Sequence, residues 1–103
     1  HILENVVYLE LLRRGYDVYI GKVDEFEVDF VAINNDGKVY VQVAETLRGS
    51  SSDDNKILDR ELRPLKKIND NYEKIILTLD KMPLANEDGI KIQNVFDWLL
   101  NKK

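Results

Sequence analysis

Two acidic side chains and a glutamine lie where two neighbouring strands and a helix could bring their oxygen atoms together. Asp29 belongs to an alternating run of polar and apolar residues over 25–33, and Gln42 belongs to a second such run over 38–45. A carboxylate on one strand beside a second oxygen on its partner can hold Mg²⁺ or Mn²⁺, since these ions prefer oxygen ligands. Glu4, in the first turn of a predicted helix, adds a third oxygen if that helix packs nearby. The pattern predicts Asp29, Gln42 and Glu4 as candidate catalytic and metal-binding residues.

The alternation also predicts which side chains share a face of the sheet. Over 25–33 it places Phe26, Val28 and Phe30 on one face and Glu25, Glu27 and Asp29 on the other. The run Asn34-Asn35-Asp36-Gly37 predicts a tight hairpin turn. Over 38–45, Val39, Val41 and Val43 share one face, and Tyr40, Gln42 and Ala44 share the other. The two runs therefore form an antiparallel pair in which Gln42 and Ala44 lie on the same face of the sheet as Glu27 and Asp29.

The remaining elements follow from hydrophobic periodicity. Helices are predicted over 2–14, 56–68 and 94–100, and further strands over 16–20, 73–79 and 90–92. Asn94 is expected to cap the last helix, and the second helix carries an apolar stripe of Leu58, Leu62, Leu65 and Ile68. Two apolar sectors on the first helix indicate that other elements cover this helix on more than one side. Pro64 should kink or restart the second helix. The polar run 48–55 predicts a mobile loop. The expected fold is a single α/β domain over 1–103, a mixed sheet flanked by helices in the order αβββαββα.

Composition excludes several classes of chemistry. The 103-residue chain has no cysteine and a single histidine, His1, which excludes disulfides, thiolate or histidine zinc sites and Ser–His catalysis. Its 15 basic and 19 acidic residues give a net charge of −4, so any nucleic-acid binding must come from a local patch. No apolar run approaches the ~20 residues of a membrane span and no signal peptide is evident, so we expect no membrane contact and a cytoplasmic location.

The order of elements and three sequence stretches carry a resemblance to a known family. The residue order Glu4, then Val28-Asp29-Phe30-Val31, then Val41-Gln42-Val43-Ala44 resembles the restriction-endonuclease-like PD-(D/E)XK fold. More closely, LENVVYLELLRRGYDVYIG, EVDFVA and VYVQVA are similar to an uncharacterised nuclease-like domain found C-terminal to prokaryotic AAA-type ATPases. The resemblance covers nearly the whole chain. It implies that the chain is the C-terminal part of a larger ATP-binding protein, with its own ATPase domain as a partner. The start of the chain without Met, inside a helical pattern, agrees with that expectation.

The resemblance also implies roles for the candidate residues, and one departure from the family pattern. The helix glutamate falls on Glu4 and the metal-binding aspartate on Asp29, whereas the E-x-K half-motif falls on Gln42-Val43-Ala44. Gln42 contributes no charge, and Ala44 removes the lysine that orients water and stabilises the transition state. Loss of one such charged group typically costs about two to three decades in rate. We therefore expect a degenerate nuclease module that recognises DNA or a protein partner and is impaired in cleavage.

Each functional interpretation has a structural alternative. Asp29 and Glu27 also fit the solvated face of a half-exposed strand, and Glu4 fits a favourable charge in a first helical turn. The best phosphate-binding candidate is a row of basic residues at helical spacing, Arg60, Arg63 and Lys67. The favoured alternative for this row is a solvated helix face balanced by Asp59 and Glu61. Trp98, with Phe96, Leu99 and Leu100, fits the core or a docking surface.

Two other functions remain open at this stage. One is a weak Mg²⁺- or Mn²⁺-dependent DNase in which Arg60 or another cation replaces the missing lysine. Lys38 is a poor replacement because it lies ~13 Å from Gln42 along an extended strand. The other is a protein-interaction or regulatory domain without a nucleic-acid role, which the acidic net charge favours.

Overall fold

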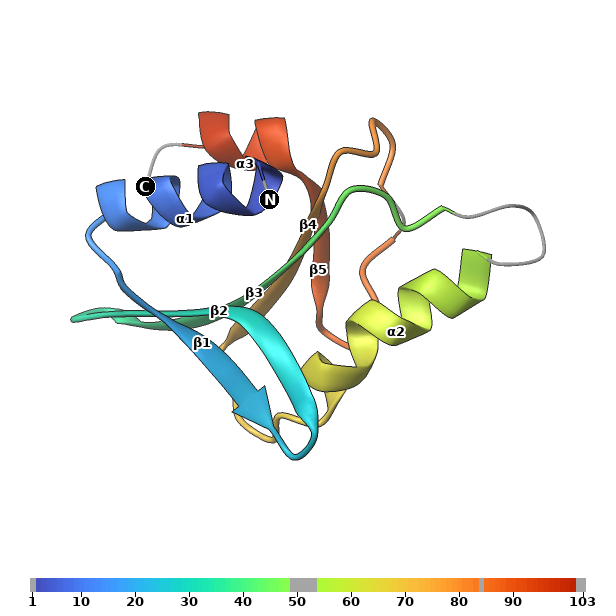
Figure 1. Ribbon diagram of the computed structural model, residues 1–103, viewed down its shortest axis with the longest axis horizontal. Helices are drawn as coiled ribbons and strands as arrows, with labels where there is room; N and C mark the ends of the chain where they lie inside the picture. The colour runs from blue at the N-terminus through green and yellow to red at the C-terminus, as the bar shows by residue number, and fades with distance from the viewer. Residues whose placement is uncertain (1, 49–53, 84, 102–103) are drawn as a thin grey trace.

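A five-stranded mixed sheet carries helices on both faces (Figure 1). The computed structural model describes residues 2–48, 54–83 and 85–101. Its elements are α1 (Ile2–Arg13), β1 (Asp17–Val23), β2 (Phe26–Asn34), β3 (Gly37–Ala44), α2 (Asp54–Lys66), β4 (Glu73–Thr78), β5 (Lys91–Asn94) and α3 (Val95–Leu100). The predicted order of elements is confirmed. The predicted loop over 48–55 lies mostly outside these ranges, because residues 49–53 are not described.

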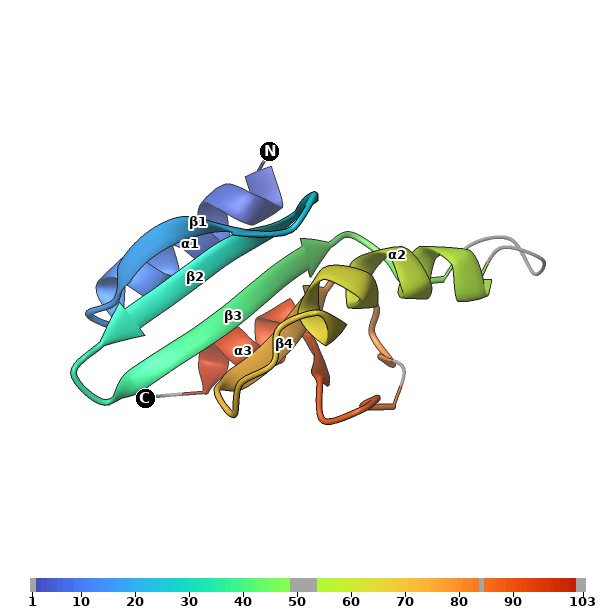
Figure 2. The same ribbon diagram turned by 90° about the horizontal axis from the view of Figure 1, so that it is seen from below.

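The strands follow one another across the sheet in chain order. β1, β2 and β3 form an antiparallel meander, whereas β4 runs parallel to β3 and β5 runs parallel to β4. The crossover from β3 to β4 carries α2 over one face, while α1 and α3 lie together on the other (Figures 1 and 2). The predicted α/β architecture with a mixed sheet is confirmed. None of the helices in the described ranges is long and apolar enough to cross a membrane.

Local side-chain chemistry fixes the ends of the helices and the central hairpin. Gly15, just after the end of α1, adopts φ 90°, and the Tyr16 N–H donates back to the Leu11 carbonyl at 3.1 Å. Asn34 Oδ1 accepts the N–H groups of Asp36 and Gly37 and so closes the predicted β2–β3 turn. Asn94 Oδ1 accepts the N–H of Phe96 at 2.8 Å, which confirms its predicted role as the cap of the last helix.

The two faces of the sheet carry separate apolar cores. Under α1 and α3, the buried side chains include Val7, Leu11, Val41 and Trp98, which places Trp98 in the core. Under α2, the predicted stripe packs on the opposite face; its members are Leu58, Leu62, Leu65 and Ile68. The prediction that Pro64 restarts the helix is wrong, because α2 continues through it to Lys66. Pro64 stands in the last turn, where its missing N–H costs only one helical hydrogen bond.

A β-bulge in β2 overturns the predicted alternation. Tyr19 and Gly21 of β1 pair with Val31 and Val28, so two steps along β1 match three along β2. As a result Val28 packs in the core under α2, whereas Phe30 packs in the core under α1. The prediction of one face for Phe26, Val28 and Phe30 is therefore wrong. The extra residue lies in the Asp29–Phe30 segment and places Asp29 at an irregular position in the strand.

The outer side of α1 is uncovered in the described part of the protein. Val7 and Leu11 are buried against the sheet, but Ile2 and Leu9 are 82% and 62% exposed. Phe96 and Leu100 of the neighbouring α3 are also exposed. Within the described residues, α1 therefore packs through only one of its two apolar sectors, and cover of the second stays a prediction.

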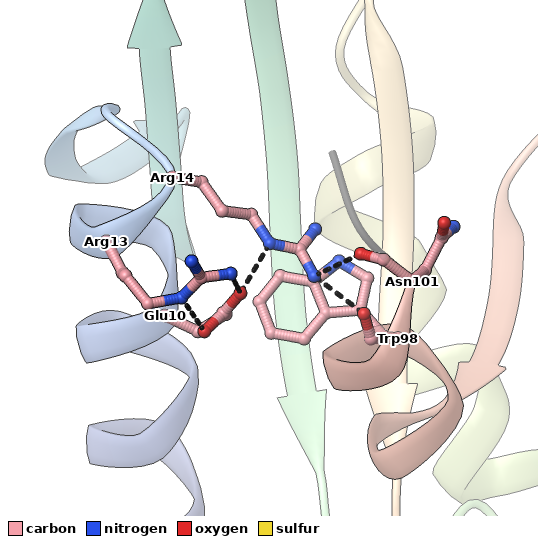
Figure 3. A network of polar contacts seen from close by, with 5 residues as sticks. All are labelled: Glu10, Arg13, Arg14, Trp98 and Asn101. Carbon is pink, nitrogen blue, oxygen red and sulfur yellow. Dashed lines mark hydrogen bonds and ion pairs between the residues drawn. The ribbon is translucent and has the colours of Figure 1, made fainter.

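Arg14 ties the end of α1 to the end of α3 (Figure 3). Its guanidinium lies 4.3 Å from the centre of the Trp98 ring and donates to the carbonyls of Trp98 and Asn101 at 2.6 and 3.1 Å. It also donates to Glu10, which Arg13 contacts from the solvent side. These arginine hydrogen bonds, that of Arg13 foremost, lower the pKa of Glu10 to about 2 against the opposing effect of burial. The charge on Arg14 satisfies carbonyl groups at the negative end of α3.

Candidate functional site

The paired strands β2 and β3 separate at Asp29, and side chains replace their hydrogen-bond ladder there. Regular pairing runs from Asn34–Gly37 to Phe30–Val41 and stops. Beyond that point the Asp29 N–H donates to Gln42 Oε1 at 2.7 Å, and the Val43 N–H donates to Asp29 Oδ2 at 2.8 Å. The two candidate residues thus satisfy backbone groups that the bulge would otherwise leave unpaired. We call this point the strand fork.

The strand fork opens into a cavity of about 470 Å³ between the sheet and α2. Asp29 and Gln42 line it from the strands, and Arg60, Glu61 and Pro64 line it from α2. Glu27 and Lys22 complete its rim from the β1–β2 hairpin. The sequence prediction that Asp29 and Gln42 lie together is confirmed in geometry.

Carboxylates dominate the electrostatics of the strand fork. Burial raises the pKa of Asp29, the hydrogen bond from Val43 opposes that rise, and the charges of Glu4 and Glu27 add to it. Glu4 is half-buried in α1 and acts on Asp29 through its charge; it does not line the cavity. Of the three predicted oxygen ligands, Asp29 and Gln42 are therefore joined by a hydrogen bond, whereas Glu4 lies at longer range.

Glu61 is a further carboxylate at the strand fork, although the sequence predicted for it only the role of balancing the basic residues of its helix. Burial raises the pKa of Glu61, the charge of Asp29 raises it further, and Arg60 opposes the shift. One signal for this position was present in the sequence. Glu61 stands three residues after Leu58 and four before Leu65, so it lies on the helix face that packs against the sheet. A carboxylate within an apolar stripe is costly to bury and is therefore often functional.

The residues of the fork do not form a ready site for a resident divalent ion. Among the residues in the described ranges, no group of three or more Asp, Glu, His or Cys side chains is arranged to hold a metal. The Gln42 oxygen and one Asp29 oxygen already accept backbone N–H groups. One Asp29 oxygen and the carboxylates of Glu25, Glu27 and Glu61 remain along the cavity, but they are not gathered into the cluster of oxygen ligands that Mg²⁺ or Mn²⁺ sites use.

The predicted basic row lies on α2 and just past its end, and its members differ in surroundings. Arg60 lines the fork cavity, and Arg63 is exposed on the next turn. Lys67 lies 4.0 Å from Asp24 and 5.7 Å from the centre of the Phe26 ring, so it contacts the β1–β2 hairpin. The three cations are all exposed, and they follow the side of α2 that leads to the strand fork.

Comparison with known proteins gives one informative relative. No protein-family model matches the chain. An uncharacterised protein of Haemophilus influenzae is 42% identical over 98 residues, which cover 95% of this chain and 22% of that protein. The chain therefore spans about a fifth of the length of the curated relative it matches. A domain of this kind is thus part of a much longer polypeptide in Haemophilus influenzae.

Proposed function

We propose that this chain is a restriction-endonuclease-like domain of the PD-(D/E)XK type that recognises DNA and is impaired in cleavage. The αβββαββα order, the mixed sheet and the placement of Asp29 beside Gln42 support the proposal. The single observation that carries it is the hydrogen-bond exchange at the strand fork. There the side chains of Asp29 and Gln42 hold the backbone of β2 and β3 together, and Ala44 offers no charge for catalysis.

The basic residues of α2 supply the DNA contacts in this proposal. Arg60 and Arg63 are exposed, and no ion pair within the described ranges engages either guanidinium. Guanidinium groups bind phosphate oxygens in a bidentate manner, and several of them on one helix face follow a nucleic-acid backbone. Lys67, one turn further along, extends the same row. The acidic net charge of the chain restricts such binding to this local patch.

The partner in the same proposal is the ATPase part of a longer cytoplasmic, prokaryotic polypeptide. The matched Haemophilus influenzae protein is several times longer than the region it shares with this chain, which leaves room for such a part. The exposed apolar side chains of α1 and α3, among them Ile2, Leu9, Phe96 and Leu100, offer a surface for it. This surface lies on the opposite face of the sheet from α2, so both contacts can form together (Figure 1).

A weak Mg²⁺- or Mn²⁺-dependent DNase is the second candidate, and Glu61 favours it. Its carboxylate lines the same cavity as Asp29 and supplies part of the negative charge that Gln42 lacks. Two cations line the cavity and are candidates to replace the missing lysine, Arg60 and Lys22. The two functions differ in what Asp29 does: cleavage requires its charge, whereas DNA binding requires only the folded α2.

Binding and cleavage of a labelled DNA duplex separate these functions. The proposal predicts salt-sensitive binding that the Arg60→Ala/Arg63→Ala double variant weakens and that Asp29→Asn leaves in place. It also predicts no turnover in Mn²⁺ above the level of Asp29→Asn. A matched double variant, Lys81→Ala/Lys91→Ala, removes the same charge elsewhere and should bind normally. Mn²⁺-dependent cleavage that Asp29→Asn or Glu61→Gln abolishes would establish the DNase instead, and absence of binding would refute the DNA proposal.

A further inference from the structure

β1 is an outer strand with one open edge. Within the part of the chain that the structure describes, β1 pairs with β2 alone, so the backbone N–H and C=O groups along its other side have no strand partner. Figure 2 shows it along the rim of the sheet. Tyr19 and Ile20, at its middle, are 57% and 75% exposed. An apolar open edge of seven residues is a template for a further strand.

An apolar groove of about 500 Å³ adjoins this edge. It lies on the α2 side of the sheet, where α2 leaves β1 and β2 uncovered, and its aliphatic floor includes Val28, Val31 and Ile33. At Gly21 the strand carries no side chain, and a Cβ there would stand 2.6 Å from Val31 Cγ2. Val31 therefore packs closely on the β1 backbone at this point, and a larger residue in place of Gly21 would displace it.

The charged side chains that line the groove are all basic. Its lining includes three lysines, Lys22, Lys38 and Lys67, and no acidic residue. This is a marked departure for a chain that has 19 acidic and 15 basic residues. The Lys38 amine lies 5.1 and 5.0 Å from the ring centres of Tyr40 and Tyr72, which hold it at the groove edge. Lys22 lines both this groove and the fork cavity.

We propose that β1 and the groove bind an extended acidic peptide segment as an additional strand of the sheet. The peptide backbone would pair with the open edge of β1, since strand addition satisfies main-chain donors and acceptors on both sides. Alternate side chains of an added strand point to one face, so aliphatic residues would reach the groove floor. Acidic residues beside them would face Lys22, Lys38 and Lys67.

The composition of the floor favours a peptide over a single-stranded nucleic acid. Base stacking needs several open aromatic faces, and the lining has two aromatic residues, of which Tyr40 is 8% exposed and only Tyr19, at 57%, is open. Arg60 and Arg63, the cations of the proposed DNA surface, do not line the groove. The peptide proposal therefore stands apart from the DNA proposal and shares only Lys67 with it.

A synthetic capped peptide of alternating valine and glutamate, long enough to span β1, tests the proposal with the 103-residue chain. Fluorescence anisotropy measures affinity, and amide hydrogen exchange by NMR locates the bound peptide. We expect added protection of amides within residues 17–23 and no binding of the same peptide with lysine in place of glutamate. The Lys22→Glu/Lys38→Glu variant should weaken binding about tenfold, as should Ile20→Ser, which removes apolar contact and leaves the lysines intact. The matched Lys81→Glu/Lys91→Glu variant should bind normally.

Three outcomes would overturn the proposal. They are absence of peptide binding to a folded chain, binding unaffected by both groove variants, and protection confined to α1 and α3. A poly-thymidine strand that binds in the groove more tightly than the acidic peptide, and loses affinity in the Lys22→Glu/Lys38→Glu variant, would assign the groove to nucleic acid instead. Concentration-dependent dimerisation that protects residues 17–23 without peptide would assign the edge to a second copy of the chain.

Discussion

Asp29 and Gln42 each complete a hydrogen bond for the backbone of the strand fork: the Asp29 N–H donates to Gln42 Oε1 at 2.7 Å, and Asp29 Oδ2 accepts from Val43 at 2.8 Å. In a regular antiparallel pair, backbone atoms would make both bonds. The bulge in β2 displaces those atoms, and the two side chains take their place. The residues that resemble a nuclease centre are thereby part of the framework of the sheet.

This arrangement predicts that Gln42 stabilises the fold. In Gln42→Leu the Asp29 N–H would lose its acceptor inside the sheet, which should lower the free energy of unfolding by about 1–3 kcal/mol. Urea denaturation measures the change. Gln93→Leu on β5 is the matched control, because the Gln93 side chain makes no hydrogen bond in the described part of the chain, and it should have a much smaller effect. Equal losses in the two variants would mean that the fork bond contributes nothing specific.

The raised pKa of Glu61 predicts an unusual pH dependence. Since the pKa of Glu61 is higher in the folded state than in the unfolded state, the ionised carboxylate destabilises the fold. This destabilisation is present at high pH and disappears as pH falls through the folded pKa towards the unfolded one. Glu61→Gln removes that destabilisation, so the variant should be more stable than the wild type at pH 7 and lose its advantage near pH 4. Denaturation midpoints across this range measure the effect. A variant that is less stable than the wild type at neutral pH would contradict the assigned environment.

Local sequence patterns predicted the element order and most side-chain faces, because short-range periodicity and capping determine them. The stripe on α2, the Asn94 cap and the valine face of β3 all follow from residues close in the chain. The bulge at Asp29 could not be predicted in this way, since its backbone bonds involve Gln42 and Val43 on another strand. The role of Glu61 likewise required knowing that α2 packs over the fork, although its place in an apolar stripe was a usable signal.

A second polar network predicts a loss of stability in acid. Asp70 accepts hydrogen bonds from the Tyr40 hydroxyl at 2.6 Å, from the buried Lys74 amine at 3.0 Å and from the Tyr72 N–H. Burial alone would raise the pKa of Asp70, but these hydrogen bonds outweigh it and lower the pKa. A carboxylate whose pKa is lowered by folding stabilises the protein at pH values above its unfolded pKa. That stabilisation is lost as pH falls through the folded pKa. Asp70→Asn should therefore cost about 1–3 kcal/mol at pH 7 and progressively less below pH 4.

Thermal or urea denaturation at both pH values checks the Asp70 prediction. Asp36→Asn, in the exposed β2–β3 turn, changes the same charge without such a network and should have little effect at either pH. A cost of Asp70→Asn that stays constant from neutral pH into acid would show that ionisation of Asp70 is not its source.

Arg14 and Arg13 offer a matched comparison of a buried and an exposed arginine on the same carboxylate. The Arg14 side chain is 6% exposed and that of Arg13 is 65% exposed, and both contact Glu10. Arg14→Met would leave the carbonyls of Trp98 and Asn101 without their charged donor, so we expect a loss of about 2–3 kcal/mol, against less than about 1 kcal/mol for Arg13→Met. Similar losses would refute the role of Arg14 in joining α1 to α3.

The salt dependence of duplex DNA binding tests the central claim most directly. Each phosphate contact adds about 0.9 to the slope of log affinity against log salt, so removal of Arg60 and Arg63 should reduce the slope by about two. We predict that reduction in Arg60→Ala/Arg63→Ala and an unchanged slope in Lys81→Ala/Lys91→Ala. An unchanged slope in the first variant, or no affinity for DNA in the wild type at low salt, would contradict DNA recognition through α2.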